Sequence, residues 1–81
     1  MVDPNADMVF RVASEIVRYL EEHPDASDGS AGIRDFWLGG IPLPKVSQVL
    51  DTALQNLVEA GVLMQVTLPG GESIFRLDKS T

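Results

Sequence analysis

One glycine, Gly61, separates two segments of this chain that differ in hydrophobic periodicity. Before it, Lys45–Ala60 places apolar side chains at spacings of three and four, which predicts an amphipathic helix. After it, Leu63–Leu68 and Ser73–Leu77 are rich in branched and aromatic residues and predict two antiparallel strands around the turn Pro69–Glu72. A glycine just past a helix end can adopt the left-handed conformation that reverses the chain. We therefore expect a helix, a sharp stop at Gly61 and a β-hairpin.

The N-terminal part of the sequence predicts a longer amphipathic helix. Asp3 can cap it with Pro4 at its first position, and Pro24 disfavours helical geometry at His23, where the helix should end. Its apolar stripe consists of Val9, Phe10, Val12, Ala13, Ile16, Val17 and Leu20. A stripe of this width predicts a helix with a broad buried face.

Residues 24–30 form a loop by composition. Their acidic residues and Gly29 invite comparison with a calcium loop. If Gly29 held the sixth position of such a loop, a proline and an alanine would hold the first and third, and neither offers a side-chain oxygen. We expect instead that Ser27 or Asp28 caps the helix that follows.

A short second helix is predicted after this loop. Ile33, Phe36 and Trp37 share one side of it, and Gly39–Gly40 ends it. The proline-stiffened segment Ile41–Leu43 must be extended and could form a short strand before the third helix. The predicted core comprises Val9, Ala13, Ile16, Leu20, Ile33, Phe36, Trp37, Val49, Leu50, Leu54, Leu57, Leu63 and Phe75.

Length and composition indicate one small domain that covers residues 1–81, with fraying expected at 1–3 and 78–81. The absence of cysteine excludes disulfides, thiolate catalysis and cysteine-ligated zinc. No apolar run approaches the roughly 18 residues of a membrane span, and the first residues lack the pattern of a signal peptide. We therefore expect a cytoplasmic protein that does not bind a membrane.

The chain is acidic, with a net charge of −6. Residues 1–30 contain seven acids and two arginines, which gives −5, so the remainder is close to neutral. An acidic balance opposes nonspecific attraction to phosphate. With one histidine and no phosphate-binding glycine motif, the sequence offers no catalytic or metal-binding constellation. We expect a protein that is not an enzyme and has no cofactor.

The chain resembles the winged helix-turn-helix superfamily over nearly its whole length. The residues that carry the resemblance are Ile33–Leu38 as the second helix, Lys45–Ala60 as the recognition-type helix, Glu59–Leu63 as the junction and Leu68–Glu72 as the wing tip. The resemblance implies an α+β fold: a three-helix core followed by a C-terminal two-stranded wing.

In that superfamily, outward residues near the start of the third helix commonly enter the DNA major groove, while the wing contacts the backbone or minor groove. The resemblance therefore implies four candidate binding residues on the helix and one on the last strand: Lys45, Ser47, Gln48, Thr52 and Arg76. Gln48 is chemically suited to adenine, and Lys45 to guanine or phosphate.

The six cations of the chain are spread over every predicted helix and the last strand, so they cannot all face one duplex. Strong DNA binding draws on about 6–10 phosphate contacts. We therefore favour a binding module for a protein partner or a second copy. The alternative is a DNA-binding regulator that acts as a dimer, because a dimer doubles the cations.

Overall fold

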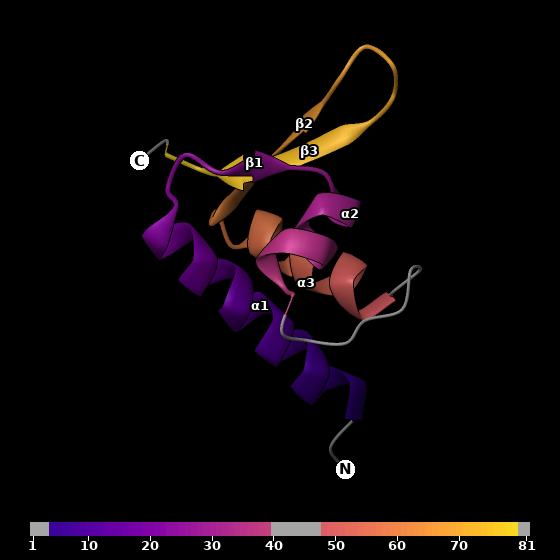
Figure 1. Cartoon of the computed structure of the whole chain (residues 1–81). Helices are drawn as coiled ribbons and strands as arrows, with labels where there is room; N and C mark the ends of the chain where they lie inside the picture. Colours follow the sequence, from indigo (N-terminus) through magenta and orange to yellow (C-terminus); the bar gives the residue numbers. More distant parts are fainter. Residues whose placement is uncertain (1–3, 40–47, 80–81) are drawn as a thin grey trace.

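The computed structural model describes residues 4–39 and 48–79 and has a mixed α+β architecture (Figure 1). In chain order the described elements are α1 (Pro4–Glu22), β1 (Ser27–Asp28), α2 (Ser30–Gly32), η1 (Ile33–Trp37), α3 (Gln48–Glu59), β2 (Leu63–Thr67) and β3 (Ser73–Leu77). The predicted α+β class is confirmed. Three predictions fall on residues outside the described ones: the cap at Asp3, the possible short strand at Ile41–Leu43 and the start of the third helix at Lys45.

Helix α1 ends where the proline predicts, and the His23 N–H donates to the Tyr19 carbonyl at 2.8 Å. Val12, Ile16 and Leu20, spaced by four, are its buried residues. The stripe is narrower than predicted because the elements packed against α1 cover only part of its surface. Phe10 lies outside the covered part, and its side chain is 75% exposed.

The short second helix begins as α2 and widens into η1, where the Leu38 N–H donates to the Ile33 carbonyl five residues earlier, at 2.9 Å. This wider turn buries Ile33, Trp37 and Leu38 together. Phe36, predicted in the core, is instead 76% exposed. Leu38, which was not predicted to be in the core, is buried. Trp37 stacks on Tyr19 with ring centroids 4.9 Å apart.

The expected side-chain cap of this second helix is absent. Gly29 occupies the cap position without a side-chain hydrogen bond. The Asp28 carboxylate accepts a hydrogen bond from the Gly29 N–H at 2.9 Å instead. An aspartate can satisfy the backbone amide next to it in place of capping a helix.

Gly61 ends α3 as predicted, with φ +78°. Its N–H donates to the Val58 carbonyl at 3.0 Å, and the Val62 N–H donates to the Leu57 carbonyl at 2.9 Å. These two bonds are those of a Schellman motif, which satisfies carbonyls at the helix end and turns the chain. Val62 packs back onto the core, and β2 begins at the next residue.

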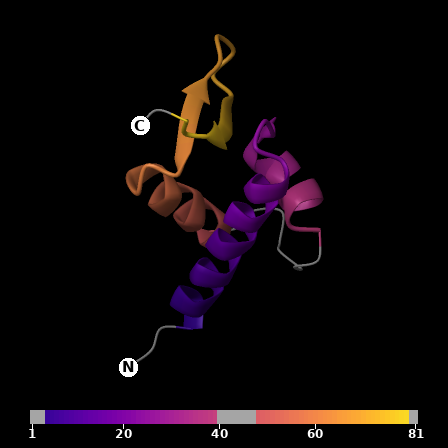
Figure 2. The same cartoon turned by 90° about the vertical axis from the view of Figure 1, so that its left-hand side faces the viewer.

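Strands β2 and β3 pair antiparallel, with Leu63 opposite Leu77 and Thr67 opposite Ser73. The hairpin stands at one end of the helices (Figure 2). At its tip Gly71 has φ +89°, and the Leu68 N–H donates to the Glu72 carbonyl at 2.7 Å.

The prediction of a loop throughout residues 24–30 is wrong at Ser27 and Asp28, and also at Ser30, where α2 begins. Ser27 and Asp28 form β1 and pair with Arg76 and Phe75, so the strand order is β1-β3-β2. The strand covers the second edge of β3. Two residues are too few to produce the alternation that reveals a strand in sequence.

One core joins the helices to the sheet. Its buried members are Val12, Ile16, Leu20, Ile33, Trp37, Leu38, Leu50, Ala53, Leu54, Leu57, Leu63 and Phe75. Three residues predicted to be core, Val9, Ala13 and Val49, pack against it while staying partly exposed. They lie where α1 and α3 meet, and all three line a groove between these two helices.

Candidate interaction surface

A groove of about 670 Å³ runs between α1 and the exposed side of α3. It is lined by Ala6, Val9, Phe10 and Ala13 from the first helix and by Gln48, Val49, Thr52, Asn56, Leu57 and Ala60 from the third helix and its end. None of these ten residues is charged. We call this surface the α1–α3 groove.

A second hollow, of about 340 Å³, continues along α1 past the Phe10 ring. It shares Phe10, Ala13 and Leu57 with the α1–α3 groove and adds Ser14, Val17, Arg18 and Glu21. Phe10 therefore lines both hollows, and most of its side chain is in contact with solvent. A large exposed aromatic side chain beside a groove with a mainly apolar lining is typical of a surface that another molecule covers.

The three predicted binding residues that the structure describes do not form one site. Gln48 and Thr52 are exposed and line the α1–α3 groove, so they border an apolar surface. Lys45 and Ser47 lie outside the described residues. Arg76 lines a different hollow, which shares no residue with the groove.

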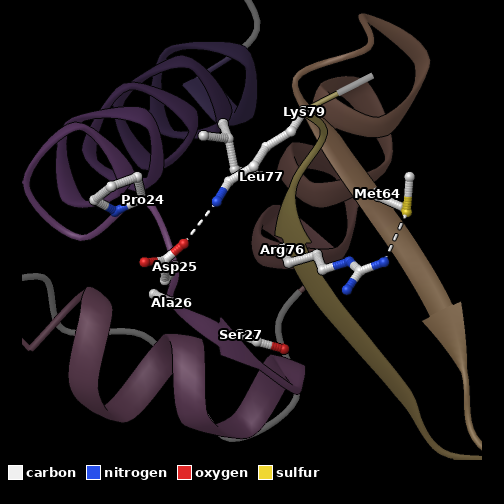
Figure 3. A pocket seen from close by; sticks show the side chains of 8 residues that line it. All are labelled: Pro24, Asp25, Ala26, Ser27, Met64, Arg76, Leu77 and Lys79. Carbon is white, nitrogen blue, oxygen red and sulfur yellow. Dashed lines mark hydrogen bonds and ion pairs between the residues drawn. The ribbon is translucent and has the colours of Figure 1, made fainter.

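That hollow, of about 350 Å³, lies between residues 24–27 and the hairpin (Figure 3). The Arg76 guanidinium reaches across to Met64, with its Nη2 atom 3.5 Å from the sulfur. Lys79 Nζ lies 2.6 Å from Asp25 Oδ1, and this hydrogen bond and ion pair lower the pKa of Asp25. The lysine charge is thus compensated within the chain.

The hollow between α3 and the hairpin is polar. Gln55 Nε2 donates to Gln65 Oε1 at 3.4 Å, and Gln65 Nε2 donates to Ser73 Oγ at 3.1 Å, which links the helix to both strands. The hollow is about 260 Å³ in volume, and Asp51 is the one charged residue among its described lining residues. Among the residues that the structure describes here, none supplies a cation that could neutralise a phosphate.

The remaining cations of the described part of the chain are distributed over other elements. Arg34 forms an ion pair with its neighbour Asp35 at 2.9 Å, and this hydrogen bond raises the pKa of Arg34. Arg11 and Arg18 lie on α1. No surface of the described chain therefore gathers the basic side chains.

Within residues 4–39 and 48–79 no three acidic, histidine or cysteine side chains come close enough to hold a metal ion. Among the described helices none has the length and apolar character needed to cross a membrane. Comparisons with protein-family models, with curated proteins and with solved structures find no match to this chain.

Sequence reasoning missed the α1–α3 groove because it expected the whole apolar stripe of α1 to form one broad buried face. The signal was present in the stripe itself. Phe10 and Val17 lie at the edge of the stripe, away from the line formed by Val12, Ile16 and Leu20. A stripe wider than the neighbouring elements can cover leaves apolar residues for another partner.

Proposed function

We infer that this chain is a small, non-enzymatic winged-helix module that binds another protein chain through the α1–α3 groove. The order of long helix, short helix, third helix and hairpin supports the winged-helix assignment that the sequence resemblance implies. A cytoplasmic location is a prediction from the sequence alone. The fold alone does not define the function, so the groove carries the proposal.

The single observation behind this function is the exposure of Phe10, 75%, beside a groove with no charged side chain among its ten described lining residues. Protein interfaces typically combine an apolar centre, depleted of charge, with aromatic anchors. The polar lining residues Gln48, Thr52 and Asn56 have hydrogen-bonding side chains that can orient a bound chain. A protein surface meets these requirements better than a polyanion does.

Photo-crosslinking in the native cells tests this function. Benzoylphenylalanine in place of Phe10 should capture a protein, identified by mass. The matched control places the same probe at Phe36, which is equally exposed at 76% but does not line the groove. Absence of a captured protein at position 10, or equal capture at both positions, contradicts the proposal.

Titration with mixed-sequence duplex DNA at about 50 and 200 mM salt tests the alternative function. We expect no saturable binding, because the basic residues of the described chain are dispersed. Tight, salt-dependent binding that Lys45→Glu and Gln48→Ala abolish, while Phe10→Ala leaves it intact, would replace the protein-binding function with DNA recognition.

A further inference from the structure

We propose that the α1–α3 groove binds a second copy of this chain, through α1 helices that pair antiparallel about a twofold axis near Ala13. This proposal rests on the proposed function and names the partner of the same surface. A twofold interface places the same patch on both copies, so the patch must be complementary to itself. Three features of α1 meet this requirement: the projecting Phe10 side chain, the hollow beside Val17 and the charges along the helix.

The apolar side chains of α1 give the surface a shape that can complement itself. Phe10 projects from α1, and Val17, two turns further along the helix, lines the second hollow together with Ala13 and Leu57. In an antiparallel pair centred on Ala13, facing residues have numbers that add up to about 26, so Phe10 lies within one residue of Val17 of the partner subunit. The ring then enters the partner's hollow while the partner's ring enters the hollow of the first copy. The small Ala13 side chain at the axis permits close approach of the two helices.

The charges on α1 select the antiparallel direction. Asp7 lies one turn before Phe10, and Arg18 follows Val17; both are exposed. The pair centred on Ala13 brings Asp7 within one residue of Arg18 of the partner subunit, which the long arginine side chain can span, and symmetry repeats this contact. A parallel pair would instead place Asp7 against Asp7 and Arg18 against Arg18. Antiparallel pairing also places Glu21 near the positive N-terminal end of the partner helix.

The length of α1 allows an extended contact between two copies. The 19 residues of α1 span about 28 Å, and the groove widens the contact onto α3. A standard interface buries about 800 Å² per partner, which is roughly a seventh of the 5480 Å² surface of this chain. Such a dimer covers Gln48 and Thr52, so those two residues cannot also read DNA.

Sedimentation equilibrium over a wide concentration range tests the dimer. The wild-type protein should approach twice the 8.8 kDa mass of the chain. Phe10→Ala should remain monomeric, and Phe36→Ala should dimerise like the wild type. Because both side chains are exposed, neither variant should lose its fold, which far-ultraviolet circular dichroism checks.

Charge reversal tests the register. Asp7→Arg alone and Arg18→Glu alone should each weaken dimerisation roughly tenfold, because symmetry converts two attractive contacts into repulsive ones. An equal mixture of the two variants should form a heterodimer, since each reversed charge then meets its opposite. The double variant Asp7→Arg/Arg18→Glu should dimerise like the wild type.

A wild-type protein that stays monomeric at all concentrations overturns the proposal, and so does a mixture of charge variants that fails to pair. A monomer whose position 10 crosslinks to a different protein overturns this inference but leaves the proposed function in place. A monomer that retains a small apolar molecule, detected by native mass spectrometry, or that crosslinks to nothing overturns both.

Discussion

Gly61 has φ +78° at the end of α3, and the N–H groups of Gly61 and Val62 close the helix by bonding back to Val58 and Leu57. A Cβ at this position would meet no atom within 4 Å, so backbone strain is the only structural cost of a larger residue. At the scale of one residue, this conformation sets the direction in which the chain enters β2.

We predict that Gly61→Ala lowers the free energy of unfolding by about 1 kcal/mol, because an L-residue is strained in the left-handed region. Gly70→Ala is the matched control. Gly70 is also surrounded by open space but is not among the described glycines with positive φ. Urea unfolding should show a shifted midpoint only for Gly61→Ala. Equal midpoints would contradict the role assigned to Gly61.

The Lys79–Asp25 pair contributes to the free energy of unfolding, and the pKa of Asp25 gives the direction in which this contribution changes with pH. The pair lowers the folded-state pKa of Asp25 below its ordinary value of 3.8. The resulting stabilisation is therefore fully present above pH 3.8 and is lost as the pH falls through the lowered pKa. Its size should be small because both side chains are mostly exposed.

We expect Asp25→Asn to lower the urea midpoint slightly at neutral pH and to match the wild type at a pH well below 3.8. Lys79→Met should show the same pH dependence, since it removes the other partner. High salt should reduce the neutral-pH difference for both variants. If the urea midpoints of the variants and the wild type differ as much at low pH as at neutral pH, the ion pair is not the cause of the difference.

Individual residues with a strong local preference were predictable from sequence. The conformation of Gly61, the turn at Gly71 and the helix end before Pro24 each follow from the chemistry of one or two residues. The exposure of Phe10 was not predictable in this way. It depends on how far α3 extends over α1, and no local preference specifies that distance.

The wider helical turn of η1 orients one of two adjacent aromatic side chains toward the core and the other toward solvent. Trp37 is buried against Tyr19, whereas Phe36 projects into solvent. Trp37→Ala should lower the free energy of unfolding by about 3–5 kcal/mol, because it leaves a large cavity. Phe36→Ala should change it by less than about 0.5 kcal/mol. Chemical denaturation of both variants measures the contrast, and similar losses would contradict the packing of η1.

The sequence predicted α1, the described part of α3 and the hairpin because each has a clear period over many residues. It misplaced Phe36 because, on one short helical turn, either neighbour can face the core, and the i to i+5 hydrogen bond that decides between them is a tertiary outcome. It missed β1 because that strand exists only through its pairing with β3.

For the whole molecule, dimerisation through α1 would make stability depend on concentration. Thermal unfolding of the wild type should shift to higher temperature as protein concentration rises, because association stabilises the folded state by mass action. Phe10→Ala should show no such shift, and Phe36→Ala should behave like the wild type. A midpoint that is independent of concentration in all three proteins would contradict the dimer.

The candidate site was predictable only in part at this scale. Gln48 and Thr52 were expected on the outer face of the third helix, and they are exposed there. Their apolar surroundings come from Ala6, Val9 and Phe10, more than thirty residues earlier in the chain. The arrangement of two helices relative to each other, which creates the groove, is not encoded in the pattern of either helix alone.

The strand order β1-β3-β2 has a consequence for biosynthesis. The central strand is the last one to be synthesised, so Ser27 and Asp28 must wait for Arg76 and Phe75 before they can pair. A nascent chain on the ribosome can form α1 early, but its sheet stays incomplete until residue 77 has emerged. Completion of the sheet is therefore a late event, and ribosome-bound chains that stall before β3 should be sensitive to protease between α1 and α2.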